Sequence, residues 1–390
     1  MTLLCHEPQI GGEVRVLVLG AGAYPHAGRP TAKVPALQPI TSAAQSARKF
    51  CDVVLGPWRY LFEQPLGSIH LLLSDPDQPD GATYVDSSGV AHNIEPCTKE
   101  NVVAARKAWM ADCGPEDILV FYCCGHGIWL PDESRTFLCS DFGVDPDDPW
   151  PYAIALDDFA FGLKEQPPRR QWLFYDCCAN TPPQAANAIN GKATALLSAT
   201  VGGQGKAAAR YPQRALSQVR IGSAVDGALA FGRTGGTSRF FDAVKEAGEG
   251  AAFISQSAHG LWRADMDGLV KAISTYAKRV AATADRAYYT FPLVTVLEGQ
   301  AAPTLLVRNQ GPDCLLRISA TPDARLLQAD LMVTDQQGVT VASQAAGHGG
   351  QTPFVRPVQP FGDYDITATF PSAPVTRRML ALPPLLDVEV

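Results

Sequence analysis

Two short segments carry residue types that together make a nucleophilic catalyst. The first is Gly125-His126-Gly127, a histidine between two glycines, and the second is Asp176-Cys177-Cys178. A thiolate can attack a carbonyl carbon, an imidazole can manage the protons, and backbone N–H groups can hold the oxyanion. If the two segments meet in one cleft, they therefore predict a Cys–His nucleophilic peptidase.

Each segment directly follows an apolar run that predicts a buried strand, 118–122 for the histidine and 172–175 for the cysteine. Reactive groups collect at the carboxyl ends of the strands in an open parallel sheet. His126 and Cys178 are 52 residues apart, a separation that suits one strand–helix–strand crossover. The intervening helix is expected near 156–163, where apolar residues recur at helical spacing.

The same alternation of strands and helices extends over residues 13–290. It predicts an α/β domain, a mainly parallel sheet flanked by helices, which we place at residues 1–295. Further strands are expected at 14–19, 69–73 and 193–199, and further helices after Ser42, after Thr98, and near 238–248 and 265–283. Residues 128–151 are interpreted as a Pro/Asp-rich excursion and 202–222 as a long loop.

The pattern changes after about residue 300, where short runs of strand character recur. They fall at 315–319, 330–334, 339–342, 364–370 and 378–382. Apolar residues alternate with polar ones in 364–370, as in a strand with one buried face. We predict a small C-terminal antiparallel β-sandwich domain at residues 300–390.

Composition limits where such a protein works. The chain has 390 residues and a formal net charge of −7, which argues against nucleic-acid and anionic-membrane partners. The N-terminus lacks the basic and apolar regions of a signal peptide, so a cytoplasmic location is expected. Ten cysteines should then stay reduced, and most of them, including Cys123, Cys124 and Cys177, are interpreted as packing residues.

The two motifs resemble those of caspase-like cysteine peptidases, within the branch of metacaspases, paracaspases and prokaryotic caspases. The resembling residues are Tyr-x-x-Gly-His-Gly at 122–127, Asp-x-Cys at 176–178 and the first-strand segment 18–24, and the resemblance covers about residues 13–290. It implies that His126 is the general acid/base and Cys178 the nucleophile. It also implies that Gly127 and Cys178 supply the N–H groups of the oxyanion hole.

The resemblance further implies what the enzyme cleaves. Asp176 stands where this branch has an acid at the floor of the S1 pocket, so protein or peptide substrates with Arg or Lys at P1 are expected. The second S1 acid of the branch is absent from Thr41-Ser42-Ala43, and Ala179-Asn180-Thr181 replaces the usual residues after the nucleophile.

The family context also suggests a regulated zymogen, acted on by an upstream protease or a regulatory protein. Candidate processing sites in 202–222 are Lys206, Arg210, Arg214 and Arg220. No cofactor or metal is expected; calcium activation occurs in parts of the group, but no EF-hand spacing is present.

Several alternatives stay open at this stage. Cys177 could be mistaken for the nucleophile, and the clustered thiols with His126 could form a zinc site, although adjacent strand residues point to opposite faces. Gly20-Ala-Gly22 invites a dinucleotide-loop interpretation, but proline replaces the third glycine. At the level of function, the rivals are a catalytically silent adaptor of the same fold and a CHAT- or gingipain-like peptidase of other specificity.

Overall fold

The computed structural model describes most of the chain. The described residues are 2–31, 33–79, 81–129, 135–177, 196–197, 216–223, 235–282, 293–296, 303–347, 350, 352–383 and 385–390. By its internal contacts the chain divides into two units, Met1–Lys245 with Tyr276–Leu306, and Glu246–Thr275 with Val307–Val390. The domain boundary expected between 295 and 300 stays a prediction.

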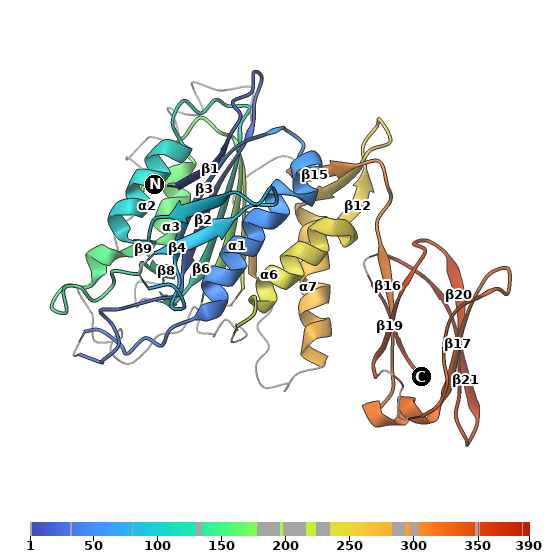
Figure 1. The fold of residues 1–390 in the computed structure, drawn as a ribbon. Helices are drawn as coiled ribbons and strands as arrows, with labels where there is room; N and C mark the ends of the chain where they lie inside the picture. The colour runs from blue at the N-terminus through green and yellow to red at the C-terminus, as the bar shows by residue number, and fades with distance from the viewer. Residues whose placement is uncertain are drawn as a thin grey trace. The chain divides into compact units, whose positions relative to one another are not determined.

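A seven-stranded sheet forms the centre of the first unit, in the order β1-β3-β2-β6-β10-β11-β14 (Figure 1). Its strands are β1 (Thr2–His6), β2 (Val14–Ala21), β3 (Leu66–Ser74), β6 (Ile118–Gly125), β10 (Arg170–Cys177), β11 (Ser217–Gly222) and β14 (Leu293–Val296). The inner pairs are parallel, and only β1 and β14 run antiparallel to their neighbours. The predicted α/β class with a mainly parallel sheet is therefore confirmed.

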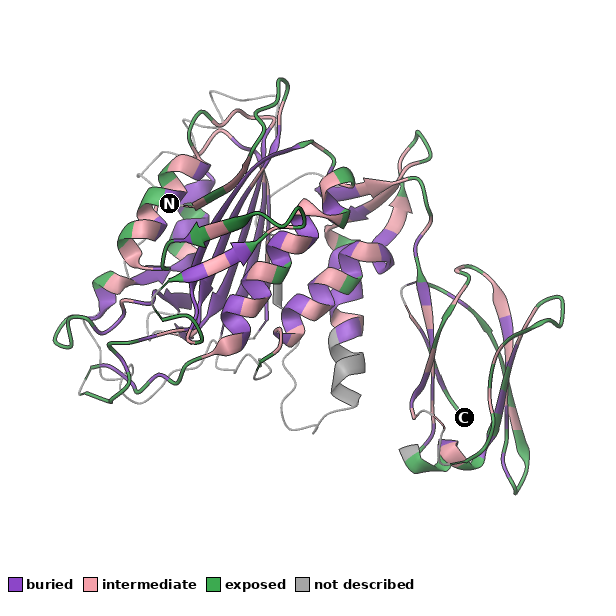
Figure 2. Ribbon diagram, viewed as in Figure 1, coloured by how far each residue is buried: buried purple, intermediate pink, exposed green. Residues whose placement is uncertain are grey.

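Helices cover both faces of this sheet, as the apolar runs of its strands require. The helices of this unit are α1 (Thr41–Leu55), α2 (Lys99–Trp109), α3 (Leu156–Leu163) and α6 (Arg239–Glu246), and α7 (Met266–Ala282) is divided between the two units. On one face Phe50 of α1 stacks on Tyr122 with ring centroids 4.5 Å apart, and on the other Phe121 packs against Phe159 of α3. Figure 2 shows the sheet buried between these two layers.

The loops of the first unit hold smaller strands. β4 (Ala82–Val85) pairs with β5 (Ala91–Ile94), and β7 (Gly127–Trp129), β8 (Arg135–Leu138) and β9 (Ala153–Ala155) form a three-stranded sheet. The predicted irregular excursion at 128–151 was therefore partly wrong, because apolar residues such as Ile128 and Phe137 pair and pack into the core. Single 3-10 turns occupy Pro57–Tyr60 and Trp150–Tyr152.

Two strand predictions need correction. Only residues 196 and 197 of the strand expected at 193–199 are described, and they lie in a bend. The place beside β10 is taken by β11, the last six residues of the segment 202–222 that was interpreted as a loop. The segment is mostly buried, including Gln218, Val219 and Ile221, and only Ser217 and Arg220 are partly exposed, as in an inner strand that is covered on both faces.

The C-terminal residues form the predicted β-sandwich. One sheet has the order β19-β16-β22 and the other β18-β17-β20-β21. The strands are β16 (Cys314–Ser319), β17 (Asp330–Asp335), β18 (Thr340–Gln344), β19 (Phe354–Val358), β20 (Asp363–Thr369), β21 (Pro374–Leu380) and β22 (Leu385–Glu389), with a 3-10 turn at Asp323–Gln328. One pair, β16 with β22, is parallel, and the others are antiparallel.

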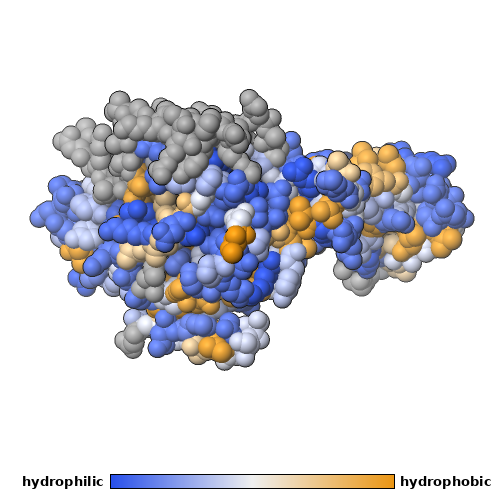
Figure 3. Space-filling model, turned by 90° about the horizontal axis from the view of Figure 1, so that it is seen from above, coloured by the Kyte–Doolittle hydropathy of each residue, from blue (hydrophilic) through white to orange (hydrophobic). Residues whose placement is uncertain are grey.

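The remaining small sheet has the order β12-β13-β15, and its strands are β12 (Phe253–Gln256), β13 (Trp262–Asp265) and β15 (Thr304–Arg308). A π-helical turn at Ala247–Ala251 precedes β12. No helix among the described residues is both long and apolar enough to cross a membrane. The face drawn in Figure 3 is mostly hydrophilic, and its apolar side chains lie in separate patches.

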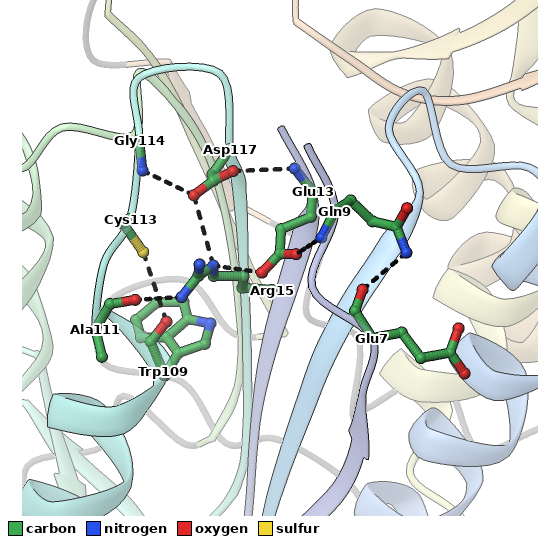
Figure 4. A network of polar contacts seen from close by, with 9 residues as sticks. All are labelled: Glu7, Gln9, Glu13, Arg15, Trp109, Ala111, Cys113, Gly114 and Asp117. Carbon is green, nitrogen blue, oxygen red and sulfur yellow. Dashed lines mark hydrogen bonds and ion pairs between the residues drawn. The ribbon is translucent and has the colours of Figure 1, made fainter. Parts of the chain in front are cut away.

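A buried polar network fixes the amino ends of β2 and β6, at the edge of the sheet opposite to His126 (Figure 4). The Glu13 carboxylate accepts from the Arg15 guanidinium at 2.8 Å, and the Asp117 carboxylate accepts from the Glu13 N–H at 3.0 Å and the Gly114 N–H at 2.8 Å. Side chains of Glu13 and Asp117 are almost fully buried. This network sets the register of β2 against β6, and with it the alignment of their far ends.

Candidate active site

Register places the two predicted catalytic segments side by side. β6 and β10 are parallel neighbours, and Gly125, the last residue of β6, is the partner of Cys177, the last residue of β10. His126 therefore lies one residue beyond the last pair on one strand. Cys178 is the next residue of the chain after Cys177 on the other strand, and it lies outside the described residues.

The imidazole of His126 is held by two groups from the segment after β2. Its Nε2 lies 2.8 Å from the carbonyl oxygen of Gln38, and its ring packs against that of Tyr24 at 5.0 Å between centroids. A carbonyl oxygen can only accept, so Nε2 carries the proton and donates it to Gln38. The neutral ring then presents Nδ1 as its basic atom, and no described residue hydrogen bonds to that atom.

The backbone around His126 is fixed as well. The hydroxyl of Tyr24 accepts from the His126 N–H at 2.9 Å and donates to the carbonyl of Ala21 at 2.8 Å. A Cβ on Gly125 would meet both the Tyr24 hydroxyl and the Ala21 oxygen within 3 Å, so only glycine fits before the histidine. Gly127 begins β7 and is buried.

Burial gives His126 the protonation state that a general base needs. Loss of water contact lowers the pKa of its imidazole, and the Gln38 carbonyl opposes that change only in part. The ring therefore stays neutral at pH values where an exposed histidine begins to gain a proton.

Asp176 lies on the face of β10 opposite to Cys177, and neutral hydrogen-bond donors surround its carboxylate. Its side chain is 3% exposed, and its Oδ2 accepts from the Tyr122 hydroxyl at 2.9 Å and from the Ser238 hydroxyl. Burial raises the pKa of the carboxyl, and the donors Ser238, Tyr122, Cys124 and Ser223 oppose this. None of these donors carries a positive charge, so a cation brought to Asp176 would gain a full electrostatic interaction at low dielectric.

Ser238 connects this carboxylate to α1 and α6. Its Oγ accepts from the Phe241 N–H at 2.9 Å, as an N-cap of α6, which leaves its own proton for Asp176. Its backbone N–H donates to the Ser46 hydroxyl of α1 at 2.8 Å, and the Gly235 N–H donates to the Thr41 hydroxyl at 3.0 Å. Helix α1 thus supplies hydroxyl groups that hold the backbone of the segment carrying Ser238.

The doubled cysteines separate by face. Cys177 and Cys123 are 0% exposed within the core cluster between the sheet and helices α2 and α3, whereas Cys124 lies with Tyr122 on the Asp176 face. Burial raises the pKa of the Cys123 and Cys124 thiols well above the ordinary value. Among the described residues, no three histidine, cysteine or acidic side chains are grouped to hold a metal ion.

The candidate processing sites fall in two groups. Lys206, Arg210 and Arg214 lie outside the described residues. Arg220 lies within β11, between β10 and β14, and its guanidinium pairs with the Asp157 carboxylate.

Sequence reasoning missed four residues of the site, Gln38, Ser46, Ser223 and Ser238, and it included Tyr24 and Tyr122 in motifs without giving them a role. Tyr122 and Cys124 are two apart and share a face with Asp176, so strand periodicity could have placed Tyr122 beside it. Ser238 directly precedes a helix, and an N-cap serine is a recognisable signal. Gln38 acts through its carbonyl, which no side-chain pattern reveals.

Comparison with known proteins gives matches among solved structures only. No model of a protein family matches the sequence, and no curated protein matches it. Among solved structures it is similar to the crystal structure of caspase-1 from Spodoptera frugiperda, at 11% identity and a TM-score of 0.41, over 73% of this chain and 85% of that one. At that TM-score the similarity carries no weight for function, which rests on the geometry above.

Proposed function

We propose that this protein is a caspase-like cysteine endopeptidase that cleaves proteins after Arg or Lys with a Cys178–His126 dyad. The observation that carries the proposal is the pairing of Gly125 with Cys177, because each catalytic residue directly follows one member of that pair. Adjacent parallel strands lie about 4.8 Å apart, so the two residues that follow start within reach of each other.

The burial of Cys177 supports Cys178 as the nucleophile. A thiol that is 0% exposed in an apolar core cannot meet a substrate carbonyl, and burial of that kind makes a cysteine inert. Of the two adjacent cysteines, Cys178 is therefore the one we assign to chemistry.

In the proposed reaction His126 accepts and then returns protons, and Cys178 forms and then releases a bond to the substrate. Nδ1 of His126 takes the thiol proton of Cys178, and the thiolate attacks the carbonyl carbon of the scissile bond. The N–H groups of Gly127 and Cys178 hold the oxyanion, and His126 protonates the leaving amine. Water, deprotonated by His126, then releases the acyl group from Cys178.

Specificity for a basic P1 residue is proposed to come from Asp176. A buried carboxylate surrounded by neutral donors favours a cation over an apolar or acidic group.

Synthesis as a regulated zymogen, in the cytoplasm, is part of the same proposal. Lys206, Arg210 and Arg214 remain its candidate processing sites. Arg220 is left out, because a strand paired on both sides cannot enter a peptidase as an extended segment.

Turnover assays test the proposal. Purified protein should release fluorophore from P1-Arg and P1-Lys peptides and not from a P1-Asp peptide, with calcium or with a chelator. Cys178→Ala and His126→Ala should abolish release, whereas the matched control Cys177→Ala should retain it. Full turnover by Cys178→Ala would overturn the assignment of the nucleophile.

A further inference from the structure

A cavity of about 270 Å³ lies at the carboxyl ends of β2 and β3, on the same edge of the sheet as His126. Small-molecule pockets are commonly about 300–1,000 Å³, so this one suits a single side chain better than a cofactor. Its walls come from the segments after β2, β3, β5 and β8. Nothing in the proposed catalytic machinery uses it.

The cavity adjoins the residues that hold His126. Ala23 and Pro25 line it and flank Tyr24, whose hydroxyl binds the His126 N–H at 2.9 Å. Ser140 also lines it, two residues after Leu138, whose N–H donates to the His126 carbonyl at 3.0 Å. Residues next to those that line the cavity therefore hold the backbone of His126.

Strand order gives the cavity a direction relative to the scissile bond. Along the carboxyl edge the sequence of strands is β3, β2, β6, β10 (Figure 1 shows the first three side by side). The P1 side chain is proposed to reach Asp176 on β10, and the leaving amine must face His126 after β6. The peptide beyond the scissile bond therefore continues toward β2 and β3, where the cavity lies.

The spacing of the strands determines which residue of the substrate reaches the cavity. Two strand intervals separate the middle of the β10–β6 pair from the middle of the β2–β3 pair, about 10 Å at about 4.8 Å each. An extended peptide advances about 3.3 Å per residue, so about three residues cover this distance.

The lining has the chemistry of a site for a long basic side chain. Pro79, Ile94 and Leu73 form an apolar wall. Ser140 also lines the cavity and is 5% exposed, and its hydroxyl makes no hydrogen bond to another described residue. Asp141 adds a carboxylate whose two oxygens each lie 3.1 Å from the Lys99 N–H.

Charge at the cavity is incompletely balanced. The other carboxylate, Asp75, is paired with Arg48. For Asp141, burial raises the pKa of the carboxyl, although the backbone N–H groups of Lys99 and Asp141 and the charge of Lys99 oppose that change, so a further positive charge beside the carboxylate would stabilise its anionic form. The ammonium or guanidinium group of a lysine or arginine side chain would supply this positive charge, while the aliphatic stem of that side chain packs on the apolar wall.

We propose that this cavity is a prime-side subsite that binds a lysine or arginine side chain about three residues beyond the scissile bond, at P2′ to P4′. The inference rests on the proposed function, because only a peptidase has a prime side. It makes the enzyme one that selects substrates with basic residues on both sides of the cut.

Two measurements test it. In quenched peptides with P1-Arg fixed, lysine is compared with norleucine, which keeps the stem and lacks the charge, at each of P2′, P3′ and P4′. At one of these positions kcat/KM should be about tenfold higher for lysine, and Asp141→Asn or Ser140→Ala should reduce this ratio. Ser140→Ala removes no hydrogen bond within the described residues, so it tests the site without threatening the fold. Asp112→Asn, an exposed carboxylate after α2, is the matched control and should preserve the ratio.

Binding separates this inference from the proposed function. A fluorescent peptide made only of prime-side residues is titrated into Cys178→Ala, and its lysine form should bind about tenfold more tightly than its norleucine form. Equal affinities, or equal values of kcat/KM at all three positions, would overturn the subsite. Absence of any cleavage by the wild-type enzyme, with the binding preference present, would instead overturn the peptidase and leave a basic-peptide site.

Discussion

Replacing Asp176 by asparagine tests the electrostatic basis of P1 specificity. The change keeps the shape of the side chain and removes its charge in a position that is 3% exposed, where water cannot screen the interaction. A hydrogen bond to a charged group contributes about 1.5–3 kcal/mol, and about 1.4 kcal/mol corresponds to a factor of ten. We therefore expect kcat/KM for P1-Arg and P1-Lys peptides to fall about 10- to 150-fold.

The assay compares P1-Arg, P1-Lys and P1-norleucine peptides with wild type and Asp176→Asn over a range of pH. Because the pKa of Asp176 is raised, wild-type cleavage after Arg should decline as the pH falls through that raised value, and cleavage after norleucine should lack this decline. The asparagine variant should lose the difference between the two profiles. Equal losses for all three peptides at unchanged melting temperature would refute the reasoning and make Asp176 a structural residue.

Three other changes have expected outcomes. Tyr24→Phe removes the acceptor of the His126 N–H and should lower kcat about tenfold with little change in KM, measured with a P1-Arg peptide; a change in KM alone would contradict this role. Glu13→Gln removes the closer of the two carboxylates that pair with Arg15, while Asp117 remains, and should lower the free energy of unfolding by about 2 kcal/mol in urea; the ratio of P1-Arg to P1-norleucine cleavage should not move. Burial lowers the pKa of His70 to about 4, so between about pH 6.5 and pH 4 the unfolded chain binds a proton at this histidine and the folded chain does not. The free energy of unfolding should therefore fall by about 3 kcal/mol as the pH is lowered across that range. His70→Leu should remove this pH dependence, and an unchanged pH profile of unfolding in the variant would contradict it.

The sequence predicted the layers of the fold because its central strands carry a simple signal. The runs 118–122 and 172–175 are continuously apolar, which only a strand covered on both faces requires, and a parallel sheet brings their carboxyl ends together. Strands β1 and β11 were harder to predict. β1 carries too few apolar residues for a pattern. β11 follows a Gly- and Gln-rich stretch, and its own buried residues include the polar Gln218, so its apolar signal is limited to Val219 and Ile221.

The candidate site also contains residues that the sequence identifies and residues that it does not. His126 and Asp176 are identifiable because their residue types are unusual at strand ends. The groups that tune them come from distant segments: the Gln38 carbonyl is 88 residues from His126, and the Ser238 hydroxyl is 62 residues from Asp176. Such contacts depend on how α1 and α6 pack on the sheet, and a single sequence does not encode that packing as a local pattern.

Covalent labelling tests the central claim most directly. The native protein is treated with a peptide that carries P1-Arg and a carbonyl electrophile, and the modified cysteine is located by mass spectrometry. We predict one adduct, on Cys178, that disappears in His126→Ala and becomes much slower when P1 is aspartate. An adduct on Cys177 or Cys124, or labelling that ignores both His126 and the P1 residue, would contradict the assignment of this site as a Cys–His peptidase.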